Sequence, residues 1–256
     1  MTSSLRIALA QWNTAWEDPV ANFNLLDTLL ENEKDLDLIV LPEMWSTGFT
    51  MNTDEAAEEI NGIALKWMLR KADELQTHIS GSIAVKDGVQ FYNRFYCVGP
   101  NGEQNQYDKK HLFSYGKEDH HYSPGQQQLT FQLGEWRIRA IVCYDLRFPV
   151  WCRNTDNYDI LLMVANWPEA RIHHWDALLT ARAIENQCYV VGVNRIGTDG
   201  NKLVYNGHSA VYDMNGKAVL EMESKEGIGK AVLDKQSLIQ FRQQYRFLQD
   251  RDQFTL

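Results

Sequence analysis

In the N-terminal half of the chain, short apolar runs alternate with segments of helical periodicity. Residues 5–11 alternate apolar and polar positions, which predicts a strand. Asp18 and Pro19 then predict an N-cap and a first helical residue, because proline lacks the N–H that would have no partner there. Apolar residues follow at helical spacing. The apolar run 36–41 predicts a buried strand that ends just before Glu43.

Strands and helices continue towards the C-terminus, with glycine-containing turns between them. A helix is expected over residues 55–75, although Gly62 weakens its middle. The dipeptide Asn215-Gly216, flanked by alternating segments, predicts a β-hairpin. We further expect strands over residues 78–85, 90–98, 104–109, 137–143, 159–166 and 188–193, and helices over residues 148–154, 169–187 and 235–242.

This order of elements predicts an α/β protein with mixed sheets. The strands are too numerous for one layer and helical stripes lie on both sides, which favours either a four-layer sandwich or a barrel-like packing. The pattern alone does not choose between these two arrangements. Because no repeat, charge block or linker rich in Gly, Ser or Pro interrupts the chain, residues 1–256 are expected to form one domain.

Composition narrows the classes of function. The 256 residues have the composition of an ordinary folded protein, and the net charge of −9 repels phosphate backbones and anionic lipids. We therefore expect neither nucleic acid nor a membrane as a partner. No apolar run reaches the ~18 residues of a membrane span, and no secretory signal is recognised. Four single cysteines predict no disulfide framework, which favours a cytoplasmic protein.

Three residues with reactive side chains stand where predicted strands end: Glu43, Lys109 and Cys143. Ligands bind at the carboxyl ends of strands in α/β sheets, so these residues form one candidate site if the fold brings the strand ends together. Each residue also has an ordinary structural interpretation. Glu43 could be a surface or helix-capping carboxylate, Lys109 a solvated loop charge and Cys143 a small buried apolar residue.

Cys143 ends an apolar strand and is followed by a polar turn into a helix, in the sequence VCYDLRFP. Such an elbow exposes the thiol and directs the backbone N–H of Tyr144 toward an incoming carbonyl oxygen. It also places the sulfur at a helix N-terminus, which favours the thiolate. The other three cysteines, Cys97, Cys152 and Cys188, lie within apolar elements and are expected in the core.

A cysteine nucleophile needs a base and a group that stabilises the oxyanion. The seven histidines are candidates for the base, but most lie in polar stretches, and no spacing of His, Cys and Asp indicates a zinc site. Glu43 is the alternative, because burial at a strand end raises the proton affinity of a carboxylate. Lys109 would supply a fixed positive charge for the thiolate and the oxyanion.

In their order and near their spacings, Glu43 in LPEMWSTGF, Lys109 in YDKKHLF and Cys143 in VCYDLRFP resemble the nitrilase superfamily of carbon–nitrogen hydrolases. The resemblance extends from the first strand through ARAIENQ and RIGTDG. It implies a four-layer α-β-β-α sandwich with two mixed β-sheets. It also implies a homodimer that packs through the helices after the cysteine strand, here residues 148–154 and 169–187.

The resemblance implies a role for each site residue. Cys143 is then the nucleophile and Glu43 the general base, while Lys109 and the N–H of Tyr144 stabilise the intermediate. Glu118, in GKEDHHYSPG, is expected to hold Lys109 and the substrate in place. The implied reaction on an amide forms a cysteine thioester, releases ammonia and then the acid, and needs no metal or organic cofactor.

Longer segments resemble one branch of that superfamily. VCYDLRFPVW, VANWP, LLTARAIENQ and NRIGTDGN are similar to the omega-amidases, which remove the terminal amide of 2-oxoglutaramate and 2-oxosuccinamate. Such small amide substrates carry a distal carboxylate, so a cation should line the pocket, and Arg147 and Arg195 are the candidates. Trp167 and Phe113 are expected as walls of the pocket.

Two other functions stay open at this point. The chain could be another amidase of the same superfamily, acting on N-carbamoyl amines or on simple aliphatic amides. It could also be a binding protein that keeps the fold without turnover. The set of Glu43, Lys109, Cys143 and Glu118 argues against the binding protein, because a decayed site has no physical reason to keep buried charges.

Overall fold

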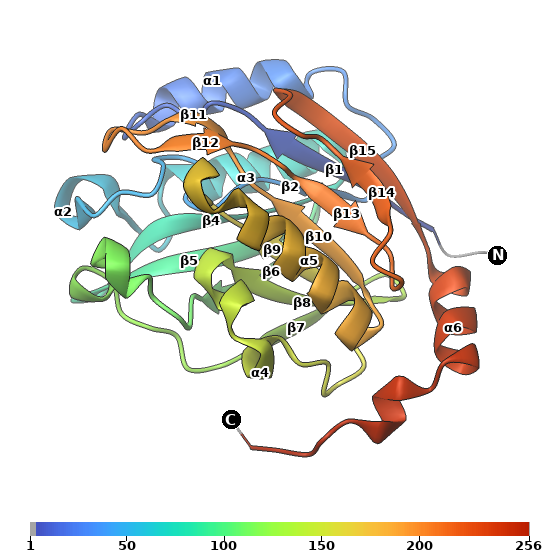
Figure 1. Ribbon diagram of the computed structural model, residues 1–256. Helices are drawn as coiled ribbons and strands as arrows, with labels where there is room; N and C mark the ends of the chain where they lie inside the picture. The colour runs from blue at the N-terminus through green and yellow to red at the C-terminus, as the bar shows by residue number, and fades with distance from the viewer. Residues whose placement is uncertain (1–3, 256) are drawn as a thin grey trace.

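Two β-sheets dominate the computed structural model, which describes residues 4–255 (Figure 1). The first sheet has the strand order β15-β1-β2-β4-β5-β6, with β3 paired to β4, and the second has the order β14-β13-β10-β9-β8-β7. Both combine parallel and antiparallel pairs, and β11 pairs with β12 in a separate ribbon. The strands are β1 (Ser4–Gln11), β2 (Leu38–Val40), β3 (Glu58–Glu59), β4 (His78–Asp87), β5 (Gln90–Val98), β6 (Gln104–Asp108), β7 (Leu129–Leu133), β8 (Trp136–Val142), β9 (Ile160–Val164), β10 (Tyr189–Val193), β11 (Ile196–Thr198), β12 (Val204–Asn206), β13 (Ala210–Tyr212), β14 (Ala218–Glu221) and β15 (Gly227–Asp234).

Helices cover the outer faces of both sheets. The α-helices are α1 (Pro19–Leu30), α2 (Thr53–Ala56), α3 (Ile63–Leu75), α4 (Pro149–Cys152), α5 (Ile172–Asn186) and α6 (Lys235–Gln244). None of these helices, within the described chain, is long and apolar enough to cross a membrane. α1 and α3 pack on the first sheet, α4 and α5 pack on the second, and Figure 1 shows α5 lying across its strands.

The main core lies between the two sheets. On β1, Ile7 and Leu9 belong to the core shared with the second sheet, while Ala8 and Ala10 belong to the cluster beneath α1 and α3. This alternation follows the two-residue period of a strand, which puts apolar residues on both faces of a sheet covered on both sides. The four layers are therefore α-β-β-α, which confirms the predicted sandwich and excludes the barrel-like packing.

The carboxyl ends of the central strands of both sheets meet at one end of the sandwich. In the first sheet β1, β2 and β4 run parallel, and in the second β8, β9 and β10 run parallel. Glu43 follows β2, Lys109 follows β6, Cys143 follows β8 and Asn166 follows β9. Hydrogen bonds from Asn166 to Glu43 join the two sheets at this end.

Several predicted elements are confirmed by their local hydrogen bonds. Asp18 caps α1 by accepting from the N–H of Ala21 (3.0 Å), and Pro19 is the first residue of that helix. The β13–β14 hairpin turns at Asn215 and Gly216, and the glycine takes the positive φ of 74° that a tight hairpin turn favours. The sequence thus fixes these boundaries through local chemistry.

The helix expected over residues 55–75 is wrong in its first half, where α2, β3 and the start of α3 follow one another. Glu58 explains the break, because its carboxylate accepts from the N–H groups of Ala64 (2.8 Å) and Leu65 (3.1 Å) and so caps α3. Gly62 precedes α3 as its N-cap residue, and a side chain there would clash with that of Glu58.

Candidate active site

Glu43 is buried in the turn after β2. The next residue, Met44, fixes this turn: its N–H donates to the Ser82 hydroxyl (2.9 Å), and its φ of 41° lies in the left-handed region. One carboxylate oxygen of Glu43 accepts from the Asn93 amide (2.7 Å) and from the Lys109 ammonium (2.8 Å). Glu43 is therefore an internal carboxylate with its own donors, and the alternatives of a surface charge or a helix cap are wrong.

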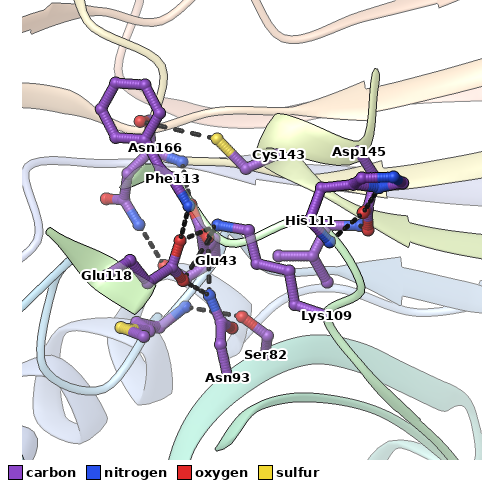
Figure 2. Close-up of polar contacts among 12 residues, drawn as sticks. Glu43, Ser82, Asn93, Lys109, His111, Phe113, Glu118, Cys143, Asp145 and Asn166 are labelled. Carbon is purple, nitrogen blue, oxygen red and sulfur yellow. Dashed lines mark hydrogen bonds and ion pairs between the residues drawn. The ribbon is translucent and has the colours of Figure 1, made fainter. Parts of the chain in front are cut away.

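The Lys109 ammonium lies between two carboxylates (Figure 2). It donates to Glu43 and to both oxygens of Glu118 (3.0 and 2.8 Å), and all three side chains are fully buried. Burial alone would lower the pKa of Lys109, but the charges of Glu118 and Glu43 outweigh burial and raise it. Burial also raises the pKa of Glu118, against the opposing charge of Lys109. Lys109 is thus a permanent buried cation.

Cys143 directly follows β8 and begins a short 3₁₀ helix, η3 (Cys143–Arg147). Its φ of 43° is uncommon for a residue with a side chain and produces the sharp elbow that the sequence indicates. The half-buried thiol contacts the backbone carbonyl of Asn166 at 3.8 Å. Because Asn166 also bonds Glu43, one residue contacts both the sulfur and the Glu43 carboxylate, as Figure 2 shows.

The expectation that a helix N-terminus stabilises the thiolate is wrong. Burial raises the pKa of Cys143 well above its usual value, the charge of Glu43 adds to this, and Lys109 offsets only part of it. The following helix has five residues of 3₁₀ geometry, too few to set up a strong dipole. The thiol is therefore protonated at neutral pH and needs a base before it can act as a nucleophile.

Asp145 holds the elbow in place, a role that no sequence motif indicated. Its buried carboxylate accepts from the N–H of Val142 (3.0 Å), from the hydroxyl of Tyr107 (2.7 Å) and from the N–H of His111 (2.9 Å), and the His111 ring nitrogen Nδ1 lies 2.8 Å away. These bonds tie the segment after β8 to the segment after β6, which carries Lys109. The sequence feature that could have indicated this role is an acidic residue two positions after the cysteine.

Two buried asparagines, Asn93 and Asn166, also belong to the site. Asn93, in the middle of β5, donates its amide to Glu43 (2.7 Å) and to Glu118 (3.1 Å). Asn166 donates its N–H to the second carboxylate oxygen of Glu43 (2.9 Å) and its side-chain amide to the Glu43 carbonyl (2.6 Å). Asn93 has no local signal in the sequence, and Asn166 is marked only by its place at a strand end.

A cavity of about 330 Å³ opens over the thiol, a size suited to a small molecule. Lys109 and Cys143 line it on the side of the charged cluster. The structure also places Phe113, Trp167 and Tyr144 on its wall, where the first two were expected. The cavity thus combines a reactive thiol, a buried ammonium and aromatic walls.

The two candidate arginines lie in different places. Arg147 lines the cavity, with its guanidinium 4.6 Å from the ring centre of Trp167. Arg195 does not line the cavity, because its fully buried guanidinium donates to the carbonyls of Thr14 (3.0 Å) and Ile196 (3.1 Å). The expectation of a substrate-binding role for Arg195 is therefore corrected: this side chain ties the segment after β10 to the segment after β1.

The arrangement suits attack by a nucleophile on a carbonyl carbon. A protonated thiol, a buried carboxylate and a buried ammonium supply, respectively, a nucleophile, a proton acceptor and a charge for an oxyanion. Among residues 4–255, no group of three or more His, Cys, Asp or Glu side chains is placed to hold a metal ion.

A four-layer sandwich with these residues at its strand ends is the architecture that the sequence resemblance implies. Residues 6–243 match the family described as carbon-nitrogen hydrolase. The chain therefore belongs to the carbon-nitrogen hydrolase family, and the predicted membership of the nitrilase superfamily is confirmed.

The individual proteins that the chain resembles include members of the branch that the sequence motifs indicate. The chain is 42% identical to omega-amidase YafV of Escherichia coli over 253 residues, 98% of each protein, and 35% identical to 2-oxoglutaramate amidase of Bacillus subtilis over 243 residues, 93% of each. A CN-hydrolase superfamily protein from Xanthomonas campestris, solved with an arsenic adduct in its active site, has a TM-score of 0.97 at 39% identity and 99% coverage of both chains. The predicted resemblance to the omega-amidase branch is thus confirmed.

Proposed function

We propose that this protein is an omega-amidase, which hydrolyses the terminal amide of small linear substrates such as 2-oxoglutaramate and 2-oxosuccinamate to the acid and ammonia. The observation that carries the proposal is the Cys143 thiol, which faces the cavity beside the buried cluster of Glu43, Lys109 and Glu118. Similarity to proteins named omega-amidase and 2-oxoglutaramate amidase supports the choice of substrate.

In the first half of the proposed reaction, Glu43 takes the thiol proton as the sulfur of Cys143 attacks the amide carbon. The carbonyl oxygen becomes an oxyanion, which Lys109 and the N–H of Tyr144 stabilise. When this intermediate collapses, the carbon–nitrogen bond breaks and Glu43 returns its proton to the departing nitrogen. Ammonia leaves, and the acyl group stays on Cys143 as a thioester.

In the second half, water replaces ammonia. Glu43 takes a proton from the water as its oxygen attacks the thioester carbon, and the same two donors stabilise the second oxyanion. The carbon–sulfur bond then breaks, the acid leaves, and the proton on Glu43 returns to the sulfur of Cys143. The sum is one amide and one water converted to one acid and one ammonia, and the enzyme returns to its starting state.

The electrostatics of the site support a base-assisted mechanism. The raised pKa of Cys143 keeps the thiol neutral, so the attack depends on proton transfer to a nearby carboxylate. Positioned general bases contribute about 10²–10⁴-fold, and one oxyanion donor about 10²–10³-fold. Glu118 and Asn93 support this role by holding Lys109 and Glu43 in fixed positions.

Arg147 supports a substrate with a distal carboxylate. Its guanidinium lines the cavity and is held by the Trp167 ring and by a hydrogen bond to the Nδ1 atom of His174 (3.1 Å). A guanidinium in a partly closed cavity binds a carboxylate through strong charge-assisted hydrogen bonds. We therefore assign Arg147, and not Arg195, to the far end of the substrate.

Exposed apolar side chains support a homodimer. Val150 on α4 and Ile184 on α5 are each more than half exposed (54% and 51%), on the outer layer that the family resemblance assigns to the dimer. Pairing this layer with that of a second copy would remove both side chains from water. Light scattering coupled to size exclusion tests this proposal, which requires twice the monomer mass, with Val150→Lys as a variant that should shift the protein to the monomer.

Ammonia release from a panel of substrates tests the proposed function. Turnover of 2-oxoglutaramate that exceeds turnover of N-carbamoyl amino acids, simple aliphatic amides and nitriles is expected. Mass spectrometry of protein quenched during turnover should show an acyl adduct on Cys143. Higher turnover of N-carbamoyl amino acids or aliphatic amides would assign the protein to another amidase activity of the superfamily, and no turnover of any member would favour a binding protein.

A further inference from the structure

A second arginine, Arg171, lines the same cavity as Arg147. It is the last residue of the 3₁₀ helix η4 (Glu169–Arg171), which precedes α5, and its side chain is half-buried. Its guanidinium lies 5.4 Å from the ring centre of Phe113. Within the described residues 4–255, its guanidinium makes no hydrogen bond or ion pair, and no carboxylate pairs with Arg147 either. Two cations on the cavity lining therefore have no counterion among the residues that the structure describes.

The two guanidiniums line one cavity, so their like charges repel each other across it. Burial lowers the pKa of Arg147, and the positive charge of Arg171 lowers it further. Each cation rests instead on an aromatic ring, Trp167 under Arg147 and Phe113 under Arg171. Two like charges in one partly buried cavity raise the free energy of the protein through their mutual repulsion. A bound anion would offset this repulsion.

The acidic residue on the cavity wall does not serve as the missing counterion. Asp199 lines the cavity, but its carboxylate accepts from the hydroxyl of Tyr205 (2.9 Å) and from the N–H groups of Asn201 (2.8 Å) and Leu203 (2.9 Å). These bonds fix Asp199 within the β11–β12 ribbon. An acceptor for the two arginines would therefore be supplied by an anionic group of the ligand.

The charges along the cavity lining orient such a ligand. Beside Cys143, the Lys109 ammonium is shared by Glu43 and Glu118, so a third carboxylate placed there would meet two negative charges in a buried site. Arg147 and Arg171, on the same cavity lining, are positive charges that pair with no carboxylate of the described residues. A molecule with an amide at one end and a carboxylate at the other is thus held with its amide toward the thiol.

We propose that Arg171 is a specificity-determining residue: together with Arg147 it forms a two-guanidinium clamp for the distal carboxylate of a linear dicarboxylic acid monoamide. This proposal rests on the proposed amidase function and names the feature that selects the substrate class. A planar carboxylate has two oxygens and can accept from both guanidiniums at once. The clamp therefore selects charged monoamides over uncharged amides of the same length.

The test compares two substrates that differ in one group, glutaramate with its distal carboxylate and glutaramide with an uncharged amide in its place. Ammonia release is measured for the wild type, Arg171→Gln, Arg171→Lys and a control, Arg246→Gln, which alters an exposed arginine beyond α6. Arg171→Gln should raise KM for glutaramate about 10- to 100-fold, because a charge-assisted hydrogen bond is lost. Its kcat/KM for glutaramide should change less than about threefold, and Arg171→Lys should retain part of the selectivity.

Equal effects of Arg171→Gln on the two substrates, or no effect on either, would overturn the clamp. Calorimetric binding of glutarate, the dicarboxylate product, tests the clamp without any turnover: Arg171→Gln should weaken glutarate binding, and unchanged affinity would also overturn it. The clamp and the amidase function can fail independently of each other. If the wild-type protein binds glutarate through Arg171 but releases no ammonia from any amide, only the amidase function is contradicted. Thermal unfolding of each variant verifies that the fold is intact.

Discussion

Asn166 donates two hydrogen bonds to Glu43, from its N–H to the carboxylate (2.9 Å) and from its side-chain amide to the backbone carbonyl (2.6 Å). The two residues follow strands of different sheets, so these bonds fix one sheet against the other at the candidate site. The Asn166 carbonyl also contacts the Cys143 thiol at 3.8 Å. One residue therefore positions both the proposed base and the proposed nucleophile.

Replacing Asn166 by alanine should damage stability and turnover together. The buried carbonyl of Glu43 loses its donor, which costs about 1–3 kcal/mol, and a misplaced base should lower kcat about 100-fold. Denaturant unfolding and ammonia release measure the two effects. Asn101→Ala, at an exposed turn, is the matched control and should change neither. Wild-type kcat in the Asn166 variant would show that this link does not position the site.

Replacing Cys143 by alanine should abolish hydrolysis and leave the fold intact, because the one hydrogen bond of the thiol within the described chain is weak and long. Cys97→Ala is the matched control: it removes a buried thiol from the core and should keep turnover close to that of the wild type. Ammonia release, with circular dichroism to verify folding, measures both variants. Full activity in folded Cys143→Ala would refute the proposed nucleophile.

Glu43→Gln should lower the pKa of Cys143 while it removes turnover. The negative charge of Glu43 raises the thiol pKa in the wild type, so its loss leaves the positive charge of Lys109 less opposed and favours the thiolate. Without the base, kcat should fall at least about 100-fold. The thiolate absorbance, followed against pH, gives the pKa.

Glu118→Gln is the internal control for that titration, because Glu118 contributes less than Glu43 to the raised thiol pKa. It should lower the pKa of Cys143 by a smaller amount. A larger shift in Glu118→Gln than in Glu43→Gln, or a thiol pKa that rises in Glu43→Gln, would contradict the assignment of Glu43 as the nearer charge.

Lys109→Met should destabilise the protein by about 3–5 kcal/mol, because it leaves buried carboxylates without their cation. The loss should depend on pH. Without Lys109, the pKa of Glu118 in the folded protein rises further above its value in the unfolded chain. A carboxyl group with such a raised pKa contributes its full stability at pH values below the unfolded-state pKa. That stability is lost as the pH rises through the folded-state pKa. The variant should therefore lose more stability than the wild type between acid and neutral pH.

Urea unfolding across that pH range measures the effect. Lys230→Met is the matched control, because Lys230 pairs with Glu33 at the surface and its loss should cost less than about 1 kcal/mol. A destabilisation of Lys109→Met that is equal at every pH would contradict the proposed coupling between Lys109 and Glu118. Adding Glu118→Gln to Lys109→Met should restore part of the stability.

Local sequence was enough to specify individual elements of the fold and to identify the reactive groups. Asp18 with Pro19, and Asn215 with Gly216, encode their cap and turn through bonds between near neighbours. Glu43, Lys109 and Cys143 could be found because each stands at a strand end inside a recognisable motif. The four-layer arrangement followed from that resemblance, because periodicity alone is equally compatible with a barrel.

Which side chains meet, and how their surroundings change their chemistry, became apparent from the three-dimensional arrangement alone. Asn93 lies on a strand of the first sheet and Asn166 follows a strand of the second, yet both bond Glu43. Arg195 was expected at the substrate and Arg171 was not singled out, because a sequence does not show which arginine faces a cavity and which faces backbone carbonyls. The protonation state of Cys143 likewise follows from burial and from a carboxylate that is remote in sequence. These effects depend on distances between residues that are remote in the sequence, and the local sequence pattern does not contain those distances.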